Sequence, residues 1–270
     1  MRWAMFIETL RRGWRGMLYW GIGVGLLTFV QIIIIPDVQA LQEMANMMET
    51  LPSWMLSAFG INDMEYMATP EGYIALQFFS YALVMFSIYA VVAGLAITSG
   101  DEDRGTLDMV LTTPIPRTRL MLERFAAYAL MAVGFVLITF LWLWIGVAIT
   151  PALTVDMGKI FGATLFLLPA TLMVLTFTTL IGALIRQRGV AVAVASAFIA
   201  VSYTFQLVGS AAEGALASVL RTVSYFHYAD GVSYLTDGAN WGNVALISVL
   251  GVLMLISGVW YFNRRDVGGL

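Results

Sequence analysis

Residues 125–150 read FAAYALMAVGFVLITFLWLWIGVAIT, an unbroken stretch without Asp, Glu, Lys, Arg or His. A helix needs about 20 consecutive apolar residues to cross the hydrocarbon core of a bilayer, which is about 30 Å thick. An open strand would leave backbone groups unpaired in lipid, so only a helix fits. The stretch therefore predicts a membrane-spanning helix, and the rest of the chain can be divided by the same pattern.

Five further stretches also lack charged residues and histidine over the length that a bilayer requires. Burying one charge at mid-membrane costs about 2.5–3.5 kcal/mol on insertion scales, so this exclusion is informative. The six predicted spans are residues 17–36, 72–100, 125–150, 160–185, 189–212 and 243–262. We therefore expect an all-α polytopic membrane protein, with residues 1–270 forming a single transmembrane domain.

The composition excludes other classes of protein. Of the 270 residues, 60% are hydrophobic and only 11% are charged, whereas charged residues make up about 25% of a soluble domain. An ordinary soluble enzyme, a disordered chain and a nucleic-acid-binding protein are all excluded on this ground. Cysteine is absent, which excludes a disulfide framework and a thiolate nucleophile.

The basic residues predict the orientation. If the six spans alternate, 12 of the 14 basic residues lie on one side, and only Lys159 and Arg221 lie on the other. The positive-inside rule then places both termini in the cytoplasm. Residues 37–71 and 213–242 become outer loops, and the first of these carries six acidic residues and no basic one.

Local signals refine two of the spans. Thr69-Pro70-Glu71 supplies a capping hydroxyl, a proline and an acid, which is typical of a helix start and here begins the second span. Pro169 lies inside the fourth span, where a proline is expected to kink the helix.

The first span has an alternative interpretation, a cleaved signal peptide. A basic flank precedes it, and residues 38–40 (VQA) loosely match a cleavage site. Its apolar run is longer than the h-region of a signal peptide, which has about 7–15 residues. We therefore expect a membrane span.

Residues 1–16 form a basic arm before the first span. Its residues Trp3, Ile7, Leu10 and Trp14 recur at helical spacing. The pattern predicts an amphipathic helix along the inner membrane interface. The arm could be a simple anchor or a contact for a cytosolic partner, and the two interpretations are compatible.

The loop between spans two and three, residues 101–117, reads DEDRGTLDMVLTTPIPR. Its acidic start suits a helix N-terminus, and Leu107, Val110 and Leu111 share one face. Pro114 and Pro116 then end the helix. The pattern predicts a short cytoplasmic helix, either a solvated loop helix or one that docks in a groove of another protein.

At this loop the chain resembles the permease subunits of type-2 ABC transporters, most of which are exporters. In that family the loop reads as acids, Arg-Gly-Thr, an acid, a Leu-rich turn, and then Pro and Ser/Thr-Arg. Weaker similarities lie at residues 69–73 (TPEGY), 224–228 (SYFHY) and 262–266 (FNRRD). Pro116 departs from the pattern, since the family often has Ser or another small residue there.

The resemblance implies that residues 101–117 form a coupling helix that docks on a cytosolic ATPase subunit. The residues that would couple are Asp101, Glu102, Asp103, Arg104, Gly105, Thr106, Leu107, Asp108 and Leu111. The arm at residues 1–16 would be the connecting helix. Two ATPase copies would serve two permease chains, identical or paralogous, which would enclose a path lined mainly by spans two and five. The family places such a chain in the cell membrane, and we expect a prokaryotic plasma membrane.

Spans two and five also carry aromatic and polar side chains that could line a path. The candidates are Phe78, Phe79, Phe86, Tyr203 and Gln206. Most such residues in membrane proteins serve helix packing or lipid contact. A path of this apolar, aromatic character would suit a lipid-like or drug-like solute better than an inorganic ion.

The sequence predicts neither a catalytic site nor a bound cofactor. A P-loop needs G-x-x-x-x-G-K-[ST], and the only lysine, Lys159, lacks that context. ATP and Mg²⁺ are therefore expected on the partner ATPase. His227 is the only histidine and lacks a visible nucleophile and orienting partner. The methionine-rich outer loop could hold Cu(I), but a helix lying on the outer surface explains it more simply, so we expect no metal.

These features predict the permease subunit of an ATP-driven ABC exporter. The expected cargo is a hydrophobic or amphipathic solute, such as a drug, an antibiotic or a lipid, which alternating access would carry across the membrane. The expected surroundings are membrane lipids, and nucleic acid is not an expected partner. The alternative is a membrane channel or scaffold that needs no ATPase.

Overall fold

The computed structural model describes residues 3–34, 39, 42–43, 46–47, 50–52, 55–56, 66, 69–98, 116–151, 153–185, 187–212 and 214–264. In this part of the chain the regular elements are helices, and no strand occurs. Six helical segments are long and apolar enough to cross a membrane. The predicted all-α architecture with six spans is therefore confirmed.

Four of the spans are continuous helices and two are interrupted. The spans are α1 (Ala4–Ile33), the series α5 (Pro70–Ile74), η1 (Ala75–Phe79) and α6 (Ser80–Thr98), then α8 (Arg117–Ile149), the pair α9 (Met157–Phe166) and α10 (Leu168–Leu184), α11 (Arg188–Ala211) and α14 (Trp241–Arg264). Three short helices separate the last two spans: α12 (Ala215–Val223), the 3₁₀ helix η2 (Tyr225–Ala229) and α13 (Gly231–Asp237).

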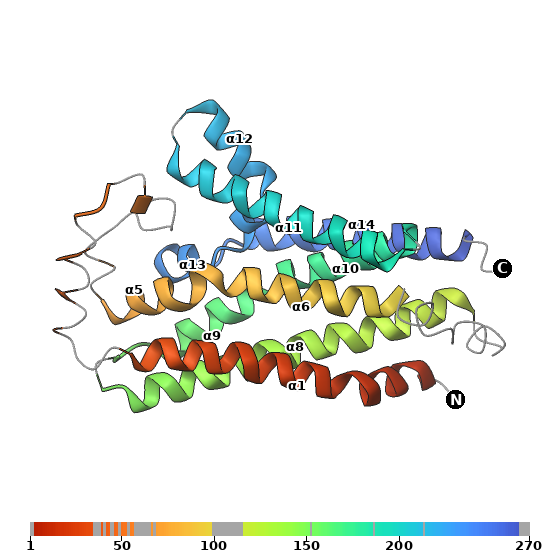
Figure 1. The fold of residues 1–270 in the computed structure, drawn as a ribbon, viewed down its shortest axis with the longest axis horizontal. Helices are drawn as coiled ribbons and strands as arrows, with labels where there is room; N and C mark the ends of the chain where they lie inside the picture. The colour runs from red at the N-terminus through yellow and green to blue at the C-terminus, as the bar shows by residue number, and fades with distance from the viewer. Residues whose placement is uncertain are drawn as a thin grey trace.

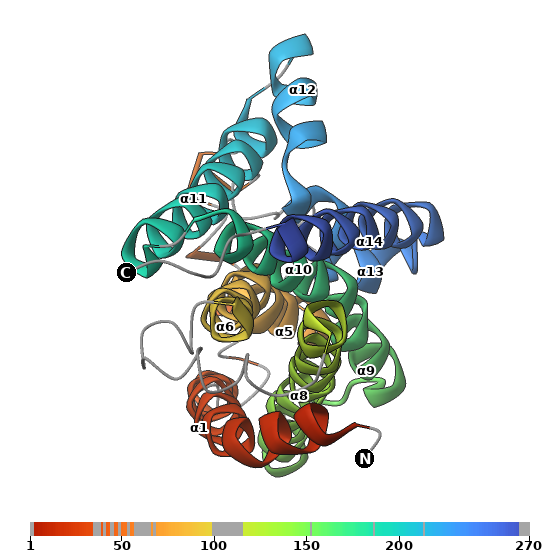
Figure 2. The same cartoon turned by 90° about the vertical axis from the view of Figure 1, so that its right-hand side faces the viewer.

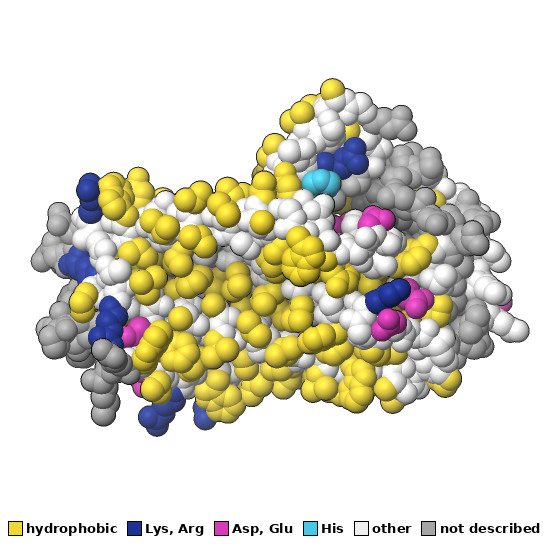
Figure 3. All heavy atoms as spheres, turned by 180° about the vertical axis from the view of Figure 1, so that it is seen from behind, with side chains coloured by type: hydrophobic (Ala, Val, Ile, Leu, Met, Phe, Trp, Pro, Cys, Tyr) yellow, Lys and Arg dark blue, Asp and Glu magenta, His cyan; other side chains and the backbone are white. Residues whose placement is uncertain are grey.

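The helices run lengthwise, and both termini lie at one end of the molecule (Figure 1). We call this the terminal end; it also holds the end of α6 and the start of α8. The opposite, distal end holds α5, α9, α12 and α13. Basic side chains gather at the terminal end, and a broad apolar belt covers the middle of the face seen in Figure 3. This distribution is that of a protein embedded in a bilayer.

The N-terminal arm and the first span form one helix. We expected a separate interfacial helix at residues 1–16, but α1 begins at Ala4 and runs without a break to Ile33. Its first turn is held by Glu123 of α8, whose Oε2 accepts hydrogen bonds from the backbone N–H groups of Met5 and Phe6 at 3.0 and 3.3 Å. A carboxylate at a helix N-terminus satisfies free donors and favours the helix dipole.

The local signals at spans two and four act as predicted. Thr69 Oγ1 accepts a hydrogen bond from the N–H of Gly72 at 3.1 Å, and Pro70 stands in the first turn. In the fourth span, α9 ends at Phe166 and α10 begins at Leu168, with Pro169 in its first turn. Since proline has no N–H to donate to the preceding turn, the helix breaks there.

The core is built around α6. Seen end-on, α6 and α10 lie in the middle, α1 and α8 lie on one side of them, and α11 and α12 project away on the other (Figure 2). The α1–α8 pair is closely packed through glycines: a Cβ on Gly21 would meet Ile138 at 2.8 Å, and one on Gly25 would clash with Trp142. Small residues let transmembrane helices approach closely, which compensates for the absence of a hydrophobic drive between helices in lipid.

Candidate functional site

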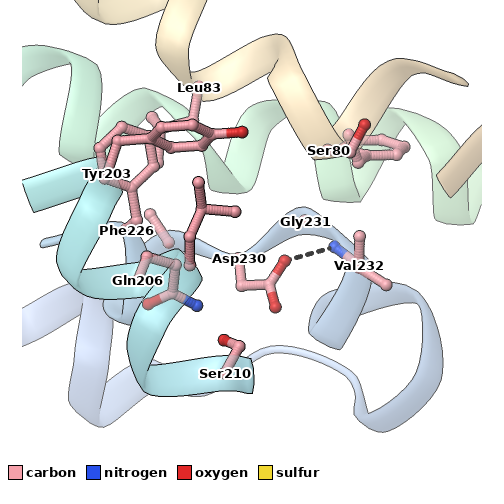
Figure 4. Close-up of a pocket in the computed structure, with 12 residues that line it drawn as sticks. Ser80, Leu83, Tyr203, Gln206, Ser210, Phe226, Asp230, Gly231 and Val232 are labelled. Atoms are coloured by element: carbon pink, nitrogen blue, oxygen red, sulfur yellow. Dashed lines mark hydrogen bonds between the residues drawn. The ribbon is translucent and has the colours of Figure 1, made fainter. Parts of the chain in front are cut away.

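A cavity of about 70 Å³ lies at the distal end, between the start of α6, the second half of α11 and the η2–α13 segment (Figure 4). Its walls combine aromatic rings, small residues and a few polar groups. The lining residues are Phe79, Ser80, Leu83, Tyr203, Gln206, Leu207, Ser210, Phe226, Ala229, Asp230, Gly231 and Val232. It therefore joins spans two and five with the short helices that follow span five.

The structure brings together three of the five candidate path residues. Phe79, Tyr203 and Gln206 line the cavity. Phe78 and Phe86 are fully buried elsewhere: their ring centroids are 6.5 Å apart, and the ring of Phe86 packs 5.0 Å from that of Phe135 of α8. The consecutive residues Phe78 and Phe79 thus lie in different places: Phe78 packs in the bundle interior, and Phe79 forms part of the cavity wall.

Residues 224–228, one of the weaker family similarities, are tied to α11 by a buried hydroxyl network. Ser202 Oγ accepts a hydrogen bond from the backbone N–H of Tyr225 at 3.1 Å. Ser224 Oγ donates to the carbonyl of Ser202 at 2.8 Å and accepts from the N–H of Phe226 at 3.3 Å. Ser202 and Ser224 are buried, and satisfied polar groups of this kind specify one local arrangement. The network holds η2 against the middle of α11.

The same segment is tied to α6. The hydroxyl groups of Ser87 and Tyr225 are 2.8 Å apart, and Ser87 Oγ also donates to the carbonyl of Leu83 at 2.7 Å. Since the single proton of Ser87 is used in that bond, Tyr225 donates and Ser87 accepts. The ring of Tyr225 also stacks on Phe198 of α11, with centroids 5.5 Å apart. Tyr225 therefore links α6 and α11.

Asp230 is the acidic group of the cavity. Its Oδ1 accepts from the N–H of Val232 at 2.9 Å, and its Oδ2 accepts from Ser233 Oγ at 2.7 Å, so it caps α13. The next residue must be glycine, because a Cβ on Gly231 would clash with the ring of Phe79. Our sequence reasoning missed both residues. An acid followed by a glycine before a short helical stretch was the available signal.

At the terminal end of the molecule, Glu123 of α8 is another candidate functional residue that sequence reasoning missed. This buried carboxylate accepts from Arg119 Nε at 2.7 Å as well as from the first turn of α1. A hollow of about 660 Å³ lies beside it. The hollow is lined by Trp3, Pro116, Thr118, Arg119, Leu122, Glu123, Phe125 and Ala126. The starts of α1 and α8 thus meet where the predicted coupling segment enters α8.

The predicted coupling residues Asp101, Glu102, Asp103, Arg104, Gly105, Thr106, Leu107, Asp108 and Leu111 lie outside the described residues. The described chain ends at Thr98 on α6 and resumes at Pro116. Most of the methionine-rich loop is likewise outside the described part. Within the described residues, no three His, Cys, Asp or Glu side chains are grouped as a metal site would require.

Comparison with protein families identifies the fold and its class of function. The family model described as ABC-2 family transporter protein matches residues 3–267, nearly the whole chain. A search of curated proteins gives no match. The match covers all six spans, the cavity and both ends of the bundle, and it confirms the resemblance drawn from the sequence. The chain therefore belongs to the ABC-2 family of transporter proteins, as the membrane-embedded permease of an ABC transporter.

Proposed function

We propose that this permease exports a hydrophobic or amphipathic solute, drug-like, antibiotic-like or lipid-like, across the cytoplasmic membrane. The observation that carries the proposal is the cavity between α6 and α11, whose walls include the rings of Phe79, Tyr203 and Phe226. Ligand sites for organic solutes are concave and mainly apolar, with a few polar groups that orient the ligand. The lining has this composition.

A single chain encloses only part of a path. The cavity of about 70 Å³ is smaller than a drug-sized site, which measures about 300–1,000 Å³. Helix α11 also leaves much of its surface uncovered, including Val194, Val201 and Val208. A second permease chain, identical or paralogous, would complete the path beside α11.

In this proposal, a partner ATPase binds at the terminal end and drives transport by ATP hydrolysis. The chain has one lysine and no P-loop, so two copies of a cytosolic ATPase would bind ATP and Mg²⁺. Residues 101–117 would be the coupling segment, and the apolar hollow beside Trp3 and Leu122 would border it, since Pro116 lines that hollow. Twelve of the 14 basic residues fall on this side of the spans, which supports a cytoplasmic location for both termini.

The test is uncoupling by Asp103→Asn. The full-length chain is purified with its ATPase and placed in proteoliposomes, and ATP-dependent solute transport and ATPase rate are both measured. We expect Asp103→Asn to lower transport per ATP hydrolysed about tenfold, the size of a typical coupling free energy between sites. Asp156→Asn is the matched control, since it also neutralises one acid but lies at the distal end, where Asp156 caps α9 by accepting from the N–H groups of Gly158 and Lys159.

Two results would overturn the proposal. Equal transport per ATP in the Asp103→Asn and Asp156→Asn proteins would rule out the coupling role of the loop. Purification without any ATPase across several detergents, together with solute flux that persists without ATP, would instead identify a channel or scaffold that needs no ATPase.

A further inference from the structure

The carboxylate of Asp230 faces the cavity without a cation to balance it. Asp230 is partly buried, and each of its oxygens accepts one hydrogen bond, from Val232 N–H and Ser233 Oγ. A carboxylate has about four acceptor positions, so capacity remains on both oxygens. Among the described side chains, no Lys or Arg forms an ion pair with it. A charge in this position costs free energy unless a partner supplies the opposite sign.

Another residue of the cavity wall carries an acceptor without a donor. Gln206 Oε1 is buried and has no hydrogen-bond partner among the described residues. Figure 4 shows the Gln206 side chain on α11 near Asp230 of the loop before α13, with the amide nitrogen on the Asp230 side and Oε1 on the other side. Buried side-chain oxygens without a donor are uncommon in folded proteins. The carboxylate of Asp230 and Oε1 of Gln206 can therefore both bind a ligand that donates hydrogen bonds.

The aromatic walls favour a cation of organic type. The rings of Tyr203 and Phe226 meet at 5.4 Å, and Phe79 lines the same cavity. Aromatic faces attract ammonium groups, whereas a Ca²⁺ site would need about six to eight oxygen ligands. No basic side chain lines the cavity. An anionic group would therefore find no opposite charge there and would be repelled by the carboxylate of Asp230.

We propose that this cavity binds the ammonium head of an alkylammonium solute, so that the exported cargo is a cationic amphipath. This inference rests on the proposed function and names its class of substrate. The N–H groups would donate to Asp230, and a 180° turn of the Gln206 amide would bring its Oε1 to the same side as a second acceptor. The rings would cover the remaining faces. The volume of about 70 Å³ suits a head group rather than a whole molecule, so the apolar tail would lie outside.

The test measures binding directly. The full-length chain in nanodiscs of phosphatidylglycerol is titrated with radiolabelled dodecylammonium by equilibrium dialysis, and binding to empty nanodiscs is subtracted. Dodecanol, with the same chain and no charge, is the comparison ligand. We expect saturable dodecylammonium binding that Asp230→Asn weakens about tenfold, the loss that follows from removing one charge-assisted hydrogen bond. Dodecanol binding should be the same in both proteins.

Two further variants control for structure. Asn is as good a helix cap as Asp, so Asp230→Asn should preserve α13. Asp156→Asn is the matched control, because Asp156 also caps a distal helix, accepting from the N–H groups of Gly158 and Lys159, but does not line the cavity. Gln206→Leu should weaken dodecylammonium binding without touching α13. Equal binding by wild type and Asp230→Asn, or an equal loss in Asp156→Asn, would overturn the proposal.

The same design separates a free solute from a lipid. If the amine head of phosphatidylethanolamine is the natural occupant, nanodiscs containing that lipid should weaken dodecylammonium binding to wild type but not to Asp230→Asn. If binding is unchanged by that lipid, the ligand is a free amphipath. This measurement needs neither ATP nor the ATPase, so failure here leaves the uncoupling result at Asp103 intact, and the reverse also holds.

Discussion

The two helices that flank the cavity, α6 and α11, are held in different ways. In the most apolar window of span two 67% of the residues are buried, against 22% for α11. Helix α6 packs against α10 and α8 in the bundle core, whereas α11 lies at the side of the bundle, where it contacts α12, α6, α10 and η2 (Figure 2). One wall of the cavity therefore belongs to the core, and the other is less buried and is joined to the rest by packing on α6 and α10 and by the hydroxyl network at Ser202.

This difference indicates which wall can move. Displacing α6 would break close contacts such as those of Gly94 with Thr178 and Leu175. Displacing α11 would break the bonds that join Ser202 to residues 224–225 and the ring contacts of Phe198 with Tyr225 and with Phe177 of α10. Elements with few buried contacts open at the lowest free energy. Three experiments, in order of expected effect, would sharpen or break the comparison.

The largest effect is expected from glycine substitutions in the two helices. A Cβ on Gly94 of α6 would lie 2.8 Å from Thr178 Cβ and 2.9 Å from the carbonyl oxygen of Leu175, whereas nothing lies within 4 Å of Gly189 on α11. We expect Gly94→Leu to lower the free energy of unfolding by about 3 kcal/mol or more, and Gly189→Leu to change it by less than about 0.5 kcal/mol. Thermal unfolding in detergent measures both. Similar melting temperatures for the two variants would mean that α6 and α11 are packed equally tightly.

An intermediate effect is expected at the attachment of α11. Ser202→Ala leaves the buried N–H of Tyr225 without its acceptor, which costs about 1–3 kcal/mol. Hydrogen exchange should quicken at Tyr225 and in η2 while α6 stays protected. Thr204→Ala is the control on the same helix, because Thr204 is exposed and its hydroxyl bonds only the carbonyl of Ala200. Faster exchange throughout α6 as well would show that the two walls open together.

The smallest effect is expected at the link between the walls. Ser87→Ala and Tyr225→Phe each remove one side of the 2.8 Å hydroxyl pair, and each should lower stability by about 1 kcal/mol. The double variant should lose little more than either single one, because the two residues share one interaction. Ser257→Ala in α14 is the control, since that exposed hydroxyl bonds only the carbonyl of Leu253. Fully additive losses would mean that Tyr225 does not join α6 to α11 through Ser87.

Features carried by consecutive residues could be predicted from the sequence. Charge-free runs gave the six spans because a bilayer tolerates neither charge nor open backbone. Thr69 and Pro169 marked a helix start and a helix break because their effects are local. The family assignment came from a motif at residues 101–117 whose positions are also contiguous.

Features that join distant residues could not be predicted. Ser87 and Tyr225 are 138 positions apart, and Met5 and Glu123 are 118 apart. That glutamate holds the first turn of α1, a contact that the pattern of the arm itself does not show. The placement of Phe78 in the bundle interior and of Phe79 on the cavity wall depends on which distant helices pack beside each ring, and composition does not show this. Asp230 looks like an ordinary helix cap until Gln206 is seen beside it.

The five-residue π-helix η1 within span two has a geometric consequence. An α-helix turns by about 100° per residue, and a π turn accommodates more residues per turn, so it shifts the angular phase of everything beyond it. The distal third of the span is thereby aimed independently of the rest: η1 contacts α13 and α1, while α6 contacts α8 and α10. A single membrane crossing thus presents two differently directed faces, one toward α13 and α1 and the other toward α8 and α10.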